Sequence, residues 1–97
     1  VHDTDADIVI LRMRSVPAMD ATAMHTLEMI YSTCVKNSIK LIFSHVNEQP
    51  MAVMKKDEFV DKIGEDNFCK NIDEALARAN QLEKEFHLDR KKKKNLE

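Results

Sequence analysis

Three apolar runs, separated by longer stretches with helical spacing, predict three strands in this chain. The first, Ile8–Arg14, is almost continuously apolar and is expected to be a strand buried on both faces. Shorter apolar runs follow at Lys40–His45 and Asn67–Lys70. Runs of this length, bounded by polar or charged residues, are typical of strands in a sheet that is covered by helices.

Helices are predicted between these strands because apolar residues recur there three and four positions apart. The first helix is expected over residues 21–37 and the second over residues 50–63. Proline at the start of the second helix has no N–H to lose, and Gly64 suits the left-handed position that ends a helix. The third helix is expected to begin near Asp73. Its buried side is predicted to consist of Ala75, Leu76, Ala79, Leu82 and Phe86.

The alternation of strands and helices predicts an α/β fold, an open sheet of parallel strands with crossover helices. A lead-in over 1–7 is expected to precede one domain over 8–88. Residues 89–97 form a basic tail, whose end, Leu96–Glu97, resembles a cloning remnant. The run Arg90–Lys94 is expected to be solvated and disordered, with contact to an anionic membrane surface as the functional alternative.

Composition argues against several classes of function. The formal net charge of −2 disfavours nucleic acid as a partner, and no apolar run is long enough to cross a membrane. The start of the chain is not that of a signal peptide, and a single glycine leaves no glycine-rich phosphate loop. Cys34 and Cys69 lack zinc-ligand spacing and are expected to be reduced core thiols. We therefore expect no metal site, and no serine, cysteine or threonine stands in a recognisable catalytic arrangement.

The most informative segment is the turn from the first strand into the first helix. The first N–H groups of a helix have no intrahelical partner, and Asp20 stands where an N-cap carboxylate would accept from them. Thr22 would present a hydroxyl from the first turn. The candidate regulatory or partner-binding loop comprises Met19, Asp20, Ala21, Thr22, Ala23 and His25. The structural alternatives are a plain cap, an ordinary first-turn threonine and a half-buried histidine.

The segment Asp20–Ala23, followed by 39–44, 49–54 and 72–76, resembles the STAS domain. It is most similar to the C-terminal cytoplasmic domain of bacterial SulP-family sulfate or anion transporters. The family's full fold has two further strands and a helix before the first strand found here. The chain therefore resembles the later portion of a STAS domain, and we expect an exposed sheet edge through which a homodimer could form.

This resemblance implies a non-enzymatic regulatory domain at the cytoplasmic face of the inner membrane. Its partners would be the transmembrane part of the same transporter and a cytosolic regulatory protein. It would couple transport to a partner, a nucleotide or a phosphorylation state, and no bound cofactor is expected beyond that nucleotide. The alternative is a soluble anti-sigma-factor antagonist that is phosphorylated at Thr22. Ala21 and Ala23 depart from the serine and glycine of antagonists. The methionines are expected to be mostly core residues, and Met19 and Met24 would form an adaptable contact surface only if they were exposed around the loop.

Overall fold

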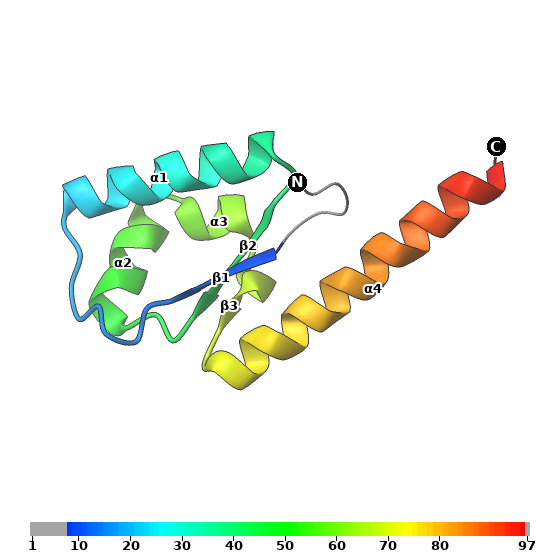
Figure 1. Ribbon diagram of the computed structural model, residues 1–97. Coiled ribbons are helices and arrows are strands. Elements are labelled where there is room, and N and C mark those ends of the chain that lie inside the picture. The colour runs from blue at the N-terminus through cyan, green and yellow to red at the C-terminus, as the bar shows by residue number, and fades with distance from the viewer. Residues whose placement is uncertain (1–7, 97) are drawn as a thin grey trace.

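The computed structural model describes residues 8–96, so the expected lead-in 1–7 and the terminal Glu97 lie outside the described residues. The elements follow one another as strands and helices in alternation (Figure 1). They are β1 (Ile8–Arg12), α1 (Ala21–Lys36), β2 (Lys40–Ser44), α2 (Glu48–Lys56), α3 (Phe59–Ile63), the 3₁₀ turn η1 (Glu65–Asn67), β3 (Phe68–Cys69) and α4 (Ile72–Leu96). The predicted α/β fold is confirmed. Each strand is one or two residues shorter than predicted.

The sheet has the order β1-β2-β3, and both strand pairs are parallel. The central strand is β2, in which Leu41, Ile42 and Phe43 are all buried. The expectation that β1 is buried on both faces is wrong, because β1 lies at an edge and the side chain of Val9 is 38% exposed. Its outer edge has no neighbouring strand among residues 8–96. A homodimer through this edge stays a prediction.

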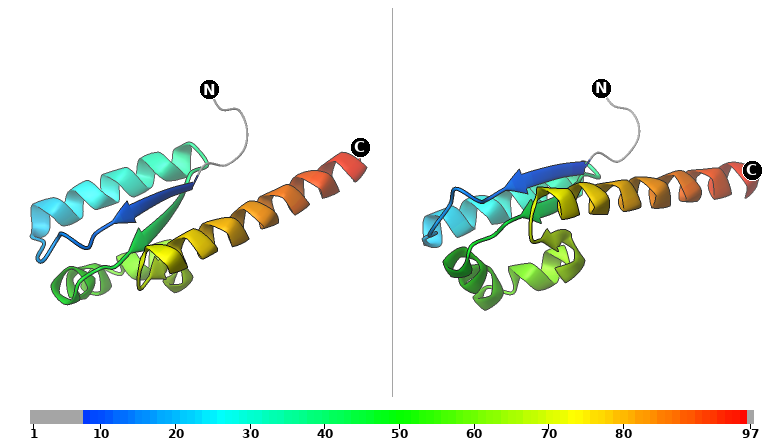
Figure 2. Two further views of the ribbon diagram at one scale, coloured as in Figure 1. Left: turned by 60° about the horizontal axis from the view of Figure 1, so that its bottom comes forward. Right: turned by 90° about the horizontal axis from the view of Figure 1, so that it is seen from below.

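Alternate residues of the central strand belong to two separate cores, one on each face of the sheet. Leu41 and Phe43 pack with α1, α2 and α3 in the larger core, whereas Ile42 packs with α4 in the smaller one. Figure 2 shows α4 on its own, away from the other helices. The smaller core is completed by Ile8, Ile10, Cys69, Ile72, Ala75, Ala79 and Leu82. Parallel strands require such cover on both faces.

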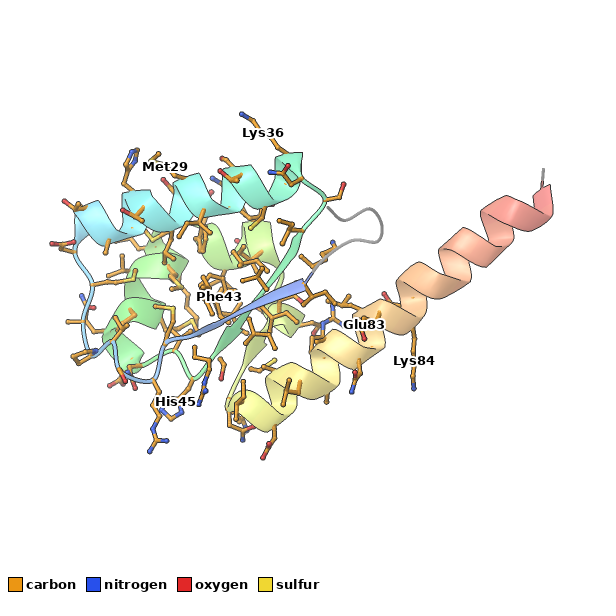
Figure 3. The ribbon with its side chains drawn as sticks, viewed as in Figure 1. Met29, Lys36, Phe43, His45, Glu83 and Lys84 are labelled. Carbon is orange, nitrogen blue, oxygen red and sulfur yellow. The ribbon has the colours of Figure 1, made fainter. Side chains whose placement is uncertain are left out.

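Aromatic rings fill the centre of the larger core. Phe43 points into the interior, as Figure 3 shows, and stacks on Phe68 with ring centroids 4.8 Å apart. Phe59 meets Phe43 edge-on at 5.9 Å, and Tyr31 meets Phe59 edge-on at 6.0 Å. Offset and edge-on contacts of this kind add to the free energy gained by burial alone. The rings therefore tie α1 and α3 to the sheet.

The single helix expected over residues 50–63 is wrong, because a left-handed residue divides it in two. Glu58 has φ of 61°, and α2 ends before it while α3 begins after it. The N–H of Glu58 donates to the Lys55 carbonyl oxygen at 3.0 Å, a bond one residue tighter than in an α-helix. The break turns both Phe59 and Val60 into the core. In a continuous helix, one of these two adjacent side chains would have pointed away from the core.

Two other details of this region concern proline and glycine. Pro50 is the third residue of α2 rather than the first, because the helix already begins at Glu48. This position costs nothing, since the first four N–H groups of a helix lack intrahelical partners in any case. Gly64 ends α3 with φ of 102°, and its N–H donates to the Val60 carbonyl oxygen at 2.8 Å. The positive φ predicted for this glycine is confirmed.

Helix α4 begins with a reciprocal pair of side-chain caps. The side-chain oxygen of Asn71 accepts from the N–H of Glu74 at 2.8 Å, and the Glu74 carboxylate accepts from the N–H of Lys70 at 3.1 Å. Leu76 is 51% exposed rather than buried, because it flanks the stripe that faces the sheet. The side chain of Phe86, also expected on the buried side, lies outside those that the structure describes. The helix passes residue 88 and continues to Leu96, so the disorder expected for the basic run is wrong for its backbone.

Candidate functional site

The loop between β1 and α1 is held from behind by two amide side chains of the β2–α2 region. Nδ2 of Asn47 donates to the carbonyl oxygens of Arg14 at 3.1 Å and Val16 at 2.9 Å. Gln49 accepts from the N–H of Met19 at 2.7 Å and donates to its carbonyl oxygen at 3.1 Å. These contacts fix a loop that has no regular secondary structure of its own.

Sequence analysis missed the role of these two amides. Asn47 occupies the N-cap position of α2 but makes no capping hydrogen bond, because its amide reaches the neighbouring loop instead. The expected start of the second helix at Pro50 concealed that position. Gln49 entered only as part of the family resemblance. An Asn and a Gln just before an expected helix were the available signal, since both side chains can donate and accept at once.

Asp20 caps α1 as predicted. Its Oδ1 accepts from the N–H of Ala23 at 2.9 Å, and its backbone is extended, as the N-cap position requires. Its carbonyl oxygen accepts the first intrahelical bond, from the N–H of Met24. The carboxylate is therefore both a structural cap and an exposed negative group beside the positive end of the helix dipole.

The expectation that the methionines are mostly core residues is confirmed for Met19 and Met24, so the surface that they would have formed if exposed is not present. Met19 and Met24 are 8% and 2% exposed and belong to the larger core. Their apolar side chains lie on the inner side of the loop and of the first helical turn, where they are buried rather than exposed to solvent. The residues of the loop that remain exposed are Asp20, Ala21, Thr22 and His25, and Ala23 is half-buried. These residues form the exposed surface of the loop.

An open hollow of about 460 Å³ lies beside this surface, between the start of α1 and the end of α2. The predicted residues Met19, Asp20, Ala21 and His25 line it. The other lining residues, which sequence analysis did not single out, are Met24, Glu28, Val53, Lys56 and Asp57. The lining therefore combines acidic and basic groups with the apolar side chains of Met24 and Val53.

The two remaining predicted residues, Thr22 and Ala23, lie outside the lining of the hollow. Thr22 is exposed on the first turn, where its carbonyl oxygen accepts from the hydroxyl of Thr26 at 3.1 Å. The structure thus places the candidate hydroxyl next to the hollow but on the outer side of α1. A group added to Thr22 would change the surface rather than fill the hollow.

Comparison with known proteins identifies the family of this fold. The family model described as STAS domain matches residues 2–75. The chain belongs to the STAS domain family. The chain is also similar to a solved structure described as a sulfate transporter family protein from Wolinella succinogenes, with 34% sequence identity and a TM-score of 0.78. That match covers 87% of this chain and 69% of the other. No curated protein sequence matches the chain. The family resemblance drawn from the sequence is confirmed.

His45 follows β2 with φ of 56°, and its N–H donates to the Cys69 carbonyl oxygen at 2.9 Å; Figure 3 shows it at the foot of the sheet. Among the residues that the structure describes, no three His, Cys, Asp or Glu side chains group in a way that could hold a metal ion.

Both cysteines of the STAS domain are free thiols. Burial raises the pKa of Cys34, and burial together with the charge of Glu74 raises the pKa of Cys69, which Arg78 partly offsets. Both thiols are therefore protonated at neutral pH, a form that is a weak nucleophile. Within residues 8–96, no helix has the length and apolar character needed to cross a membrane.

Proposed function

We propose that this STAS domain is a non-enzymatic regulatory module of a SulP-type sulfate or anion transporter, at the cytoplasmic face of the inner membrane. Its partners are the transmembrane part of the transporter and a cytosolic regulatory protein. The observation that carries the proposal is the fixed loop at the start of α1. It presents Asp20, Ala21, Thr22 and His25 together, beside an open hollow. Similarity to a sulfate transporter family protein supports the transporter assignment.

The loop is suited to recognition because its shape does not depend on the partner. Asn47 and Gln49 already hold it in the unbound domain. A surface that is ordered before binding avoids the entropy cost of ordering on contact. The exposed groups are an acid, a hydroxyl and an imidazole at a helix start. This set favours a partner with polar, partly basic groups.

Phosphorylation of Thr22 would act on this surface by electrostatics. A phosphate adds a charge of about −1.5 to −2 at neutral pH. The helix N-terminus favours that charge, whereas Asp20, two positions away, opposes it. The expected net effect on folding is small, while the surface potential beside the hollow changes strongly. One modification could therefore release a partner and leave the domain folded.

Transport measurements in the full-length transporter test this proposal. We expect Asp20→Ala and Thr22→Glu to alter sulfate uptake at equal expression and equal membrane content. Thr33→Glu is the matched control, because Thr33 is also exposed on α1 but lies three turns away. Uptake that is unchanged in both loop variants, or that changes equally in the control, would show that the loop has no regulatory role.

The alternative is a soluble anti-sigma-factor antagonist, and the exposed hydroxyl of Thr22 in the first turn of α1 favours it. In that case a partner kinase would phosphorylate Thr22, and the unmodified domain would bind the kinase. Cell fractionation with an antibody to this domain separates the two proposals. A large product that pellets with membranes supports the transporter, and a small product in the cytosol supports the antagonist.

A further inference from the structure

Positive charge is concentrated at the end of the last helix. Residues 90–94, here named the basic tip, are five consecutive basic residues and contain a third of the 15 lysines and arginines in the chain. The formal net charge of the whole chain is −2, so the chain without the basic tip would carry −7. The basic tip and the rest of the chain therefore carry net charges of opposite sign.

The fold separates these two parts in space. Helix α4 runs back against the direction of the parallel strands and continues past the sheet, so that its second half extends away from the other helices (Figures 1 and 2). The loop between β1 and α1 lies at the opposite end of the molecule, whose longest dimension is 48 Å. The strands begin on the same side as the end of α4.

We propose that the basic tip binds the anionic phospholipid headgroups of the membrane that carries the transporter. Each lysine near such a surface raises the binding constant roughly fivefold. The negatively charged remainder of the chain is repelled by the same surface. The two effects together orient the molecule, with the basic tip at the headgroups and the loop at Asp20 facing the cytosol. The inference rests on the proposed function, which supplies the membrane.

The arrangement of the charges favours a surface contact over insertion and over nucleic acid. Positions 90–94 follow one another without an apolar residue, so they provide no apolar face that could enter the acyl region. The basic tip also contains no aromatic residue on which a base could stack. The negative remainder of the chain would oppose a polyanion that wraps around the domain. Headgroups at a flat surface meet only the basic tip.

Vesicle sedimentation of the purified chain tests this inference. We expect binding to vesicles of phosphatidylcholine with phosphatidylglycerol, little binding to phosphatidylcholine alone, and loss of binding at about 0.5 M salt. The variant Lys92→Gln with Lys93→Gln should weaken binding about tenfold or more. The matched control removes two exposed lysines outside the basic tip, Lys55→Gln with Lys70→Gln, and should weaken binding far less than the basic-tip variant.

Several outcomes would overturn the inference. These are equal binding to both vesicle types, equal weakening by the two double variants, and absence of binding to anionic vesicles at low salt. Binding of an RNA or DNA oligonucleotide without vesicle binding would also contradict it. Circular dichroism of each variant checks that the fold is retained. Vesicle binding does not depend on the loop at Thr22, so failure here is distinct from failure of the uptake experiment on the proposed function.

Discussion

The side-chain amide of Gln49 makes two hydrogen bonds to the main chain of a single residue, Met19. Its Oε1 accepts from the Met19 N–H at 2.7 Å, and its Nε2 donates to the Met19 carbonyl oxygen at 3.1 Å. The two residues are 30 positions apart in the sequence. Because Met19 directly precedes the cap of α1, this one side chain fixes the start of α1 relative to α2.

Removal of the Gln49 amide is expected to loosen the loop. Gln49→Leu has a similar size but neither hydrogen bond, and each lost bond lowers the free energy of unfolding by about 0.5–1.5 kcal/mol. We expect the Met19 amide hydrogen to exchange faster with solvent, because its acceptor is gone. Lys55→Leu, on the exposed side of α2, is the control and should change stability by less than about 0.5 kcal/mol. An unchanged exchange rate at Met19 would contradict the assigned role.

The cap of α1 gives a second prediction. Asp20→Ala removes the acceptor for the Ala23 N–H and should lower the free energy of unfolding by about 1 kcal/mol, within the range for lost N-caps. Asp20→Asn keeps an acceptor oxygen and should retain most of that stability. Urea unfolding of the three proteins measures both differences. If Asp20→Asn loses as much as Asp20→Ala, the charge of the carboxylate rather than its capping bond stabilises the helix.

The order of the elements was predictable because each follows from a local pattern. Apolar runs marked the strands, and the cap at Asp20 marked the start of α1. The break at Glu58 was not predictable, because its left-handed conformation serves the packing of Phe59 and Val60 together, and a glutamate carries no preference for it. The edge position of β1 likewise depends on which strands pair, which periodicity does not reveal.

The candidate loop was predictable to the same extent. The exposed acid and hydroxyl followed from their place at a helix start. The burial of Met19 and Met24 followed from their apolar character, whereas the hollow beside α2 did not follow from the sequence, because it depends on how α2 packs against α1. Lys56 and Asp57 lie more than 25 positions from His25 in the sequence and meet it only at the hollow. Contacts of that range need the tertiary fold.

Stability of the larger core is expected to depend strongly on Phe59. Its side chain is fully buried and meets both Phe43 and Tyr31 edge-on. Phe59→Ala leaves a cavity between α3 and the sheet and should lower the free energy of unfolding by about 3–5 kcal/mol. Phe59→Leu fills most of that space and should cost less than Phe59→Ala. Val9→Ala, at the exposed edge strand, is the control, and an equal loss there would mean that the aromatic cluster adds nothing.

The two thiols make stability depend on pH above neutrality. The pKa values of Cys34 and Cys69 are raised above the ordinary value of 9.0, chiefly because burial disfavours the thiolate. The unfolded chain therefore loses these protons at lower pH than the folded domain does. Unfolding releases protons in that window, so the thiol contribution to stability is full below pH 9.0 and declines as the pH rises through the raised folded values.

Urea unfolding at about pH 7.5 and about pH 9.5 measures this decline. The variant that carries Cys34→Ala and Cys69→Ala is the comparison, because it keeps every lysine and tyrosine that also titrates in this range. We expect the unchanged chain to lose more free energy of unfolding between the two pH values than the variant does. Since the folded thiols stay protonated, they should also react slowly with a thiol reagent at neutral pH. Equal losses in the two proteins would show that burial does not shift these thiols.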